Sequence, residues 1–167
     1  MKLSTPLCLF LAIIPALKAE SLPQLSAKPF IARYSGYEQR KFRFSVNLNG
    51  VGQLIPSNGK DDYLSDRLAV NFVPAIEETL PDGTVKILRA VNDGWEAVTP
   101  AAANPEKISY RGTVAGGARF EVNLEFNGTE IRGGGRVIEK GKSANPLRFV
   151  LRLEVPNLYS YDTDPEK

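Results

Sequence analysis

Histidine is absent from all 167 residues of this chain. Histidine is the usual general base at neutral pH and the commonest ligand for transition metals. Its absence excludes Ser-His-Asp and Cys-His catalysis, and it excludes zinc sites built from histidine and cysteine. The chemistries that remain are those of carboxylates, Ser-Lys pairs and tyrosine, together with calcium bound by oxygen ligands.

Cysteine occurs once, at Cys8, inside a segment 1–19 with the layout of a secretory signal peptide. Lys2 supplies positive charge, a short apolar run follows, and cleavage is expected between Ala19 and Glu20. A membrane-spanning helix needs about 20 apolar residues, more than this run provides. The mature chain is therefore expected to be secreted or periplasmic, without a disulfide or a transmembrane helix. The alternative is an uncleaved anchor or a buried N-terminal helix.

Net charge is also absent from the expected mature chain. The whole sequence has 21 Lys and Arg against 19 Asp and Glu, and two of the lysines, Lys2 and Lys18, lie in the expected signal. Binding to nucleic-acid phosphates needs a basic patch, so no nucleic-acid partner is expected. No cofactor motif is visible. The partners that stay open are an unknown envelope protein and a small apolar ligand.

From about Phe42 onward, apolar and polar residues alternate with a period of two, as in strands with one buried face. Prolines and glycine-containing turns separate these stretches, and no long amphipathic helix or fixed repeat is visible. The sequence therefore predicts an all-β fold, an antiparallel meander forming a rolled β-sandwich or a small β-barrel. Both architectures show the same alternation, so both stay open.

The expected layout after the signal has three parts. An N-terminal arm covers 20–39, a single antiparallel β domain covers 40–158, and a polar tail covers 159–167. Pro74 is expected to interrupt a strand, because proline cannot donate to a strand ladder. The stretch 75–80 fits one helical turn.

One hairpin in the second half has a register that can be predicted. With a three-residue loop at 115–117, Tyr110 lies opposite Val122. On the other face Arg111 lies opposite Glu121, which brings opposite charges together. A loop one residue shorter would place apolar side chains opposite charged ones, so the three-residue loop is preferred.

The next hairpin is marked by Asn127-Gly128, a strong turn signal. A two-residue turn there places Phe120 opposite Gly135. Because Phe120 also faces Gly112 in the preceding hairpin, we expect the sheet to bend sharply at Phe120. The alternative is that 133–135 form a turn between two short strands.

Three aspartates, Asp61, Asp62 and Asp66, cluster in one polar stretch. Calcium binds several carboxylate and carbonyl oxygens, so these residues are calcium candidates. Their spacing does not match the EF-hand loop, and a solvated surface loop is the preferred interpretation.

Two further features are candidates for binding or catalysis. Trp95, the only tryptophan, could stack on a ligand, although core packing is the preferred interpretation. Glu77 and Glu78 are adjacent carboxylates, but neighbours on a strand point to opposite faces and could not share one substrate.

The most defensible function is that of an exported, non-catalytic β-domain, a binding or interaction module of unknown ligand. The alternatives are a carboxylate-dependent, glycosidase-like secreted enzyme and an outer-membrane β-barrel. An enclosed apolar cavity would indicate a carrier of small ligands. A packed interior would indicate docking through the surface.

Overall fold

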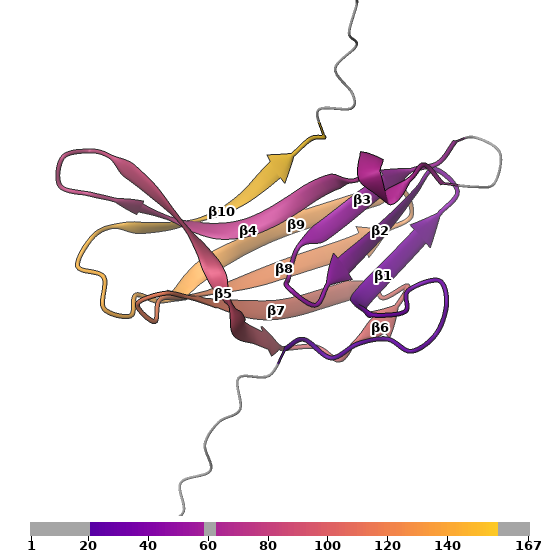
Figure 1. Cartoon of the computed structure of the whole chain (residues 1–167). Helices are drawn as coiled ribbons and strands as arrows, with labels where there is room; N and C mark the ends of the chain where they lie inside the picture. The colour runs from indigo at the N-terminus through magenta and orange to yellow at the C-terminus, as the bar shows by residue number, and fades with distance from the viewer. Residues whose placement is uncertain (1–20, 59–62, 157–167) are drawn as a thin grey trace, which may run out of the picture.

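The computed structural model describes residues 21–58 and 63–156, and its regular structure is almost entirely strand (Figure 1). One short 3₁₀ helix, η1 (Asp66–Leu68), precedes β4. The strands are β1 (Arg33–Gln39), β2 (Phe42–Asn47), β3 (Gly52–Pro56), β4 (Val70–Thr79), β5 (Val85–Ala97), β6 (Ala102–Ala103), β7 (Lys107–Val114), β8 (Arg119–Asn127), β9 (Glu130–Glu139) and β10 (Leu147–Glu154). The expected signal, its cleavage site at Ala19 and Glu20, and the tail 159–167 lie outside the described residues.

All ten strands belong to one sheet, so the all-β prediction is confirmed. The order is β6-β1-β2-β3-β4-β5-β7-β8-β9, and β10 pairs with β4. The sheet is not closed into a barrel, because β9 and β10 do not pair with each other. It is also mixed rather than wholly antiparallel, since the alanines of β6 pair with β1 in parallel.

Strand β4 is where the sheet divides. β10 pairs with β4 along nearly its whole length, and therefore occupies one edge. β3 pairs with 70–72 and β5 with 75–79, so these two strands share the other edge in succession. Pro74 lies between the two ladders, where neither requires an N–H donor. The predictions that Pro74 interrupts a strand and that 75–80 form a helical turn are therefore wrong.

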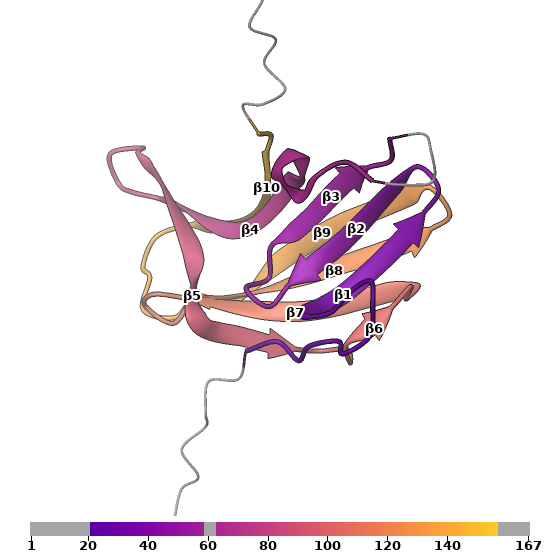
Figure 2. The same ribbon diagram turned by 45° about the vertical axis from the view of Figure 1, so that its right-hand side comes forward.

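This division lets the two parts of the sheet face each other, with β1–β3 opposite β7–β9 (Figure 2). Aromatic rings fill the space between them. The ring of Phe126 lies 4.7 Å from that of Tyr37 and 5.7 Å from that of Phe44. Tyr34 and Tyr110 meet edge to face at 5.8 Å. We call the surface that carries these rings the inner face of the sheet.

The sheet begins earlier than expected. Arg33–Gln39, placed by the sequence in an N-terminal arm, forms β1 and contributes buried Tyr34 and Tyr37 to the core. Leu22 and Phe30, which precede β1, are buried as well. Part of the expected arm is therefore integral to the packed domain.

The predicted register of β7 and β8 is confirmed. Tyr110 pairs with Val122, Arg111 with Glu121, and a three-residue loop joins the strands. The Val114 N–H donates to the Ala118 carbonyl at 2.9 Å and closes that loop. Phe120 lies opposite Gly112, whose missing side chain makes room for the ring.

The predicted register of β8 and β9 is wrong by two residues. Phe120 pairs with Val137, and Gly135 pairs with Val122. The turn residues are Gly128 and Thr129, not Asn127 and Gly128, and only Gly128 has a positive φ, of 58°. A type II′ turn requires a glycine at its first central position, which explains the shift. Residues 133–135 lie within β9 and are not a turn.

Candidate functional site

The inner face of the sheet is completely covered at one end and open at the other. On β8, Phe120 has an exposed fraction of 0%. At the end of the chain, by contrast, Leu153 and Val155 are 63% and 60% exposed. Leu153 belongs to the apolar row of β10, and Val155 follows directly after the strand. An earlier member of the row, Phe149, packs with its ring 5.7 Å from that of Phe120. The core therefore continues into an apolar surface that no other element of residues 21–58 and 63–156 covers.

We call this surface the apolar mouth. Its members are apolar residues that are half-buried or exposed around the end of β10: Leu54, Val70, Phe72, Ile131, Leu151, Leu153 and Val155. Pairing brings them together, because Phe72 lies opposite Leu153 on β10 and opposite Gly52 on β3. The ring of Phe72 also lies 5.7 Å from that of buried Phe44, which forms the floor.

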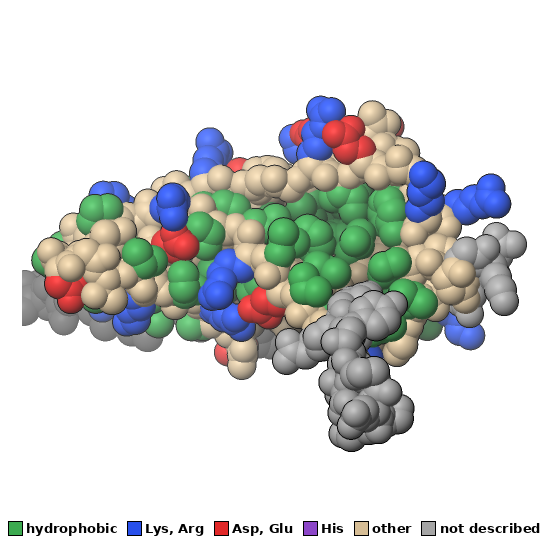
Figure 3. Space-filling view, turned by 90° about the horizontal axis from the view of Figure 1, so that it is seen from above, with side chains coloured by type: hydrophobic (Ala, Val, Ile, Leu, Met, Phe, Trp, Pro, Cys, Tyr) green, Lys and Arg blue, Asp and Glu red, His purple; other side chains and the backbone are tan. Residues whose placement is uncertain are grey.

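The mouth opens between two strands that touch without pairing. The side chain of Leu151 packs against Gly133 of β9, and the ring of Phe149 packs against Gly135. Beyond these contacts the end of β10 rises away from the start of β9 (Figures 1 and 2). Figure 3 looks down on this side of the molecule, where hydrophobic side chains form one continuous area. Large exposed apolar areas are a known feature of interaction surfaces, which makes the mouth the candidate site.

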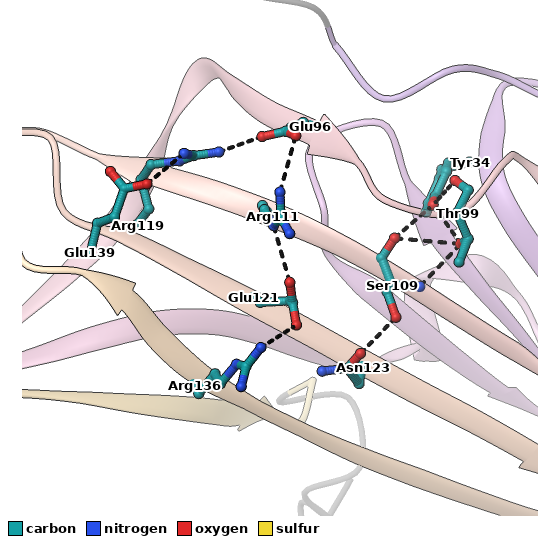
Figure 4. A network of polar contacts seen from close by, with 10 residues as sticks. All are labelled: Tyr34, Glu96, Thr99, Ser109, Arg111, Arg119, Glu121, Asn123, Arg136 and Glu139. Carbon is teal, nitrogen blue, oxygen red and sulfur yellow. Dashed lines mark hydrogen bonds and ion pairs between the residues drawn. The ribbon is translucent and has the colours of Figure 1, made fainter.

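The opposite, outer face of β5 and β7–β9 carries a ladder of ion pairs (Figure 4). Arg111 donates to Glu121 at 3.0 Å and lies 3.3 Å from Glu96. Arg119 connects Glu96 to Glu139, with a distance of 2.8 Å to the latter. The hydrogen bond from Arg111 lowers the pKa of the Glu121 carboxyl, assisted by the nearby positive charges. These carboxylates are engaged with arginines and hold the strands in register.

A second polar group lies on the same sheet. The Tyr34 hydroxyl donates to the Thr99 carbonyl at 2.6 Å, and Ser109 donates to the Asn123 side chain at 2.6 Å. Burial raises the pKa of Tyr34, and the hydrogen bonds to Thr99 partly oppose this rise. These contacts satisfy partly buried polar groups, and a further bond from the Tyr34 hydroxyl to the Ser109 carbonyl, at 3.1 Å, connects β1 to β7.

The residues singled out from the sequence do not meet at one site. Asp66 lies in η1, with its carboxylate 3.9 Å from Arg33, while Asp61 and Asp62 lie outside the described residues. Among 21–58 and 63–156, no three acidic or other metal-binding side chains cluster. Trp95 packs in the core, 5.9 Å from the rings of both Tyr110 and Phe120.

Glu77 and Glu78 point away from each other, as alternation on a strand requires. Glu77 pairs with Arg148 on β10. Glu78 accepts hydrogen bonds from Ser143 at 2.6 Å and from Asn145 at 3.0 Å, and these bonds lower its pKa. The arrangement gives no pair of carboxylates facing a common cleft.

Two hollows among the described residues share no lining residue with the mouth. One, of about 310 Å³, is lined mainly by charged residues at the ends of β7–β9, among them Lys107, Glu125 and Arg132. The other, of about 240 Å³, is lined by three lysines, Glu78 and small residues. Both are open to solvent, unlike an enclosed apolar ligand site.

The mouth could not have been located from the sequence alone. The alternation of apolar and polar residues in β10 is visible in the sequence. This alternation does not show that the end of the apolar row is exposed. Within the described part of the chain, no helix is long and apolar enough to cross a membrane. Comparison with known proteins gives no match, whether to a protein-family model, a curated protein or a solved structure.

Proposed function

We propose that this protein is exported and acts as a non-catalytic interaction module that docks through the apolar mouth. The observation that carries the proposal is the exposure of Leu153 and Val155, at 63% and 60%, at the end of a strand whose earlier residues Leu147 and Phe149 pack against the core. Leaving such side chains in water costs free energy, about 25 cal/mol per Å² of apolar area. A partner that covers them recovers that free energy.

Docking is favoured over enclosure of a small ligand because aromatic rings already fill the interior. The ring of Trp95 contacts those of Tyr110 and Phe120, and all three are buried. Docking is favoured over carboxylate catalysis because Glu77 and Glu78 diverge and each has its own partners. Among the surfaces of the described residues, these observations favour the mouth for docking.

Site-specific photocrosslinking tests this proposal in the cells that make the protein. A photoreactive residue replaces Leu153 in the mouth or, as the control, Val85 on β5, which is 51% exposed and lies away from the mouth. We expect a protein adduct from position 153 and none from position 85. No adduct at 153, or equal adducts at both positions, would contradict docking through the mouth. A lipid-sized adduct at 153 would point to a ligand instead.

Export is tested separately. The mature protein is expected to appear outside the cytoplasm with Glu20 as its first residue, which N-terminal sequencing of the fractionated protein determines. An intact Met1 in the cytoplasmic fraction would contradict export.

A further inference from the structure

We infer that the partner at the apolar mouth is a second copy of this chain, which adds its own β10 to the free edge of β10. The two strands form an antiparallel ladder centred on Leu153. This inference rests on the proposed function, because it names the partner of the same surface. The occupant is argued from the edge, the register and the charges of β10.

The free edge of β10 is unprotected. β10 pairs with β4 in an uninterrupted register from Leu147 to Glu154, and it pairs with no other strand of the described chain. Proteins commonly protect an edge strand with a proline, a lysine or a bulge. β10 has none of these within its length, and two of its three charged residues, Arg152 and Glu154, have opposite signs and can pair across a two-fold ladder. Such an edge offers unpaired backbone groups to another strand.

Contacts with β9 decide which part of the edge is available. Phe149 and Leu151 lie against glycines of β9, so the first half of β10 has no room for a further strand. The second half diverges from β9 (Figure 2). A new ladder is therefore centred on Arg152–Glu154, with Leu151 at its inner boundary, where the contact with β9 ends. This is where the exposed apolar side chains are.

Charge then selects one register. In a two-fold ladder centred on Leu153, Arg152 lies opposite Glu154 of the second copy, and Leu151 lies opposite Val155. Opposite charges meet on one face and apolar side chains on the other. A centre at Arg152 or at Glu154 would place like charges opposite each other. A centre at Leu151 would run the ladder into β9.

The side chains needed for this register are free to meet. Arg152 is exposed and makes no ion pair with any described residue. The Glu154 side chain is 40% exposed, and only its Oε1 contacts Arg89, at 2.6 Å. Its second oxygen can accept from the second copy. The symmetry is that of an isologous dimer, in which both copies use the same surface.

The interface is small, because each copy contributes a ladder of about five residues and the apolar side chains beside it. The dimer should therefore be reversible, with a Kd of about 1–100 µM, as measured by analytical ultracentrifugation. A full-length chain that stays monomeric up to about 500 µM would overturn the inference.

A charge exchange tests the register. Arg152→Glu or Glu154→Arg alone places like charges opposite each other, and each is expected to raise the Kd at least about tenfold. The double variant restores opposite charges across the two-fold axis and should return the Kd to near the original value. Arg148→Gln is the matched control, since Arg148 lies on the same face of β10 but outside the ladder, and the neutral side chain avoids a like charge beside Glu77. A double variant that stays monomeric would overturn the register.

Cross-linking gives a second, independent reading. In a Cys8→Ser background, Leu153→Cys should form an intermolecular disulfide, because the residue on the two-fold axis faces its own copy. Val85→Cys, an exposed apolar position of β5, should not. If the chain is monomeric but position 153 still photocrosslinks to another protein, the second copy is wrong and the proposed docking function stands.

Discussion

The ring of Phe149 on β10 occupies the space that a side chain at Gly135 on β9 would need. A Cβ at Gly135 would come within 2.5 Å of Phe149 Cζ and within 2.5 Å of the Glu121 carbonyl oxygen. Since β9 and β10 share no hydrogen-bonded ladder, this contact and that of Leu151 with Gly133 join the two ends of the open sheet. Packing, rather than pairing, holds the sheet in its rolled form.

Gly135→Ala should therefore destabilise the protein by about 1–3 kcal/mol, because the added methyl group meets a backbone oxygen that cannot move away. Urea unfolding followed by tryptophan fluorescence measures the change. Gly134→Ala is the matched control, since nothing lies within 4 Å of its Cβ position and its free energy of unfolding should hardly change. Equal losses from both substitutions would show that β10 does not pack on β9.

Phe120→Ala should cost about 3–5 kcal/mol of unfolding free energy, because it leaves a large cavity beneath Trp95 and Phe149. Val85→Ala, at an exposed position, should change stability by less than about 0.5 kcal/mol. Thermal and urea unfolding of both variants compare them directly. A loss below about 0.5 kcal/mol for Phe120→Ala would mean that the ring is not part of the core.

The two hairpins of the second half show what the sequence can and cannot predict. For β7 and β8, the loop length and the pairing of opposite charges favour the same register, and the structure has that register. For β8 and β9, the turn signal at Asn127-Gly128 was read one residue too early. That register would have placed Glu125 opposite Glu130, whereas the true register places it opposite Arg132. Charge pairing across the strands was the overlooked signal.

The candidate site depends on contacts that local patterns do not contain. β10 pairs with β4, about 70 residues earlier in the chain, and this partner cannot be read from alternation. Pro74 was taken as a strand breaker, although it lies between two ladders that meet on one strand. The exposure of Leu153 follows from how far β10 diverges from β9, a property of the whole sheet.

Arg111→Glu should destabilise the protein more than Arg33→Glu. Arg111 lies between two carboxylates, and the Glu121 side chain is only 12% exposed. Reversal would leave Glu121 without its closest donor and beside a like charge, at a cost of about 1–3 kcal/mol. Arg33 meets only the largely exposed Asp66, at 3.9 Å, so its reversal should cost less than about 0.5 kcal/mol. Equal shifts in the melting temperature would contradict the ladder.

The response to pH follows from the same carboxylate. With no histidine in the chain, the free energy of unfolding should hardly change between about pH 6 and pH 8. Glu121 has a pKa below its ordinary 4.5, chiefly because Arg111 donates to its charged form. A carboxyl whose pKa is lowered on folding stabilises the protein above its unfolded-state pKa. It loses that contribution as the pH falls through the folded-state value. Stability should therefore fall between about pH 5 and pH 3.

Glu121→Gln measures how much this carboxylate contributes to the pH dependence of stability, apart from the other acidic residues. The variant should be less stable than the parent at pH 7, but its stability should fall less steeply in acid, because one proton-linked group is gone. Arg111→Gln should flatten the acid response in the same direction, since it removes the donor that lowers the pKa. Urea unfolding at several pH values gives the slopes, and a carboxyl NMR titration gives the pKa of Glu121 directly. Parallel stability curves for parent and variants, or a Glu121 pKa at or above 4.5, would show that Arg111 does not stabilise the fold through this carboxylate.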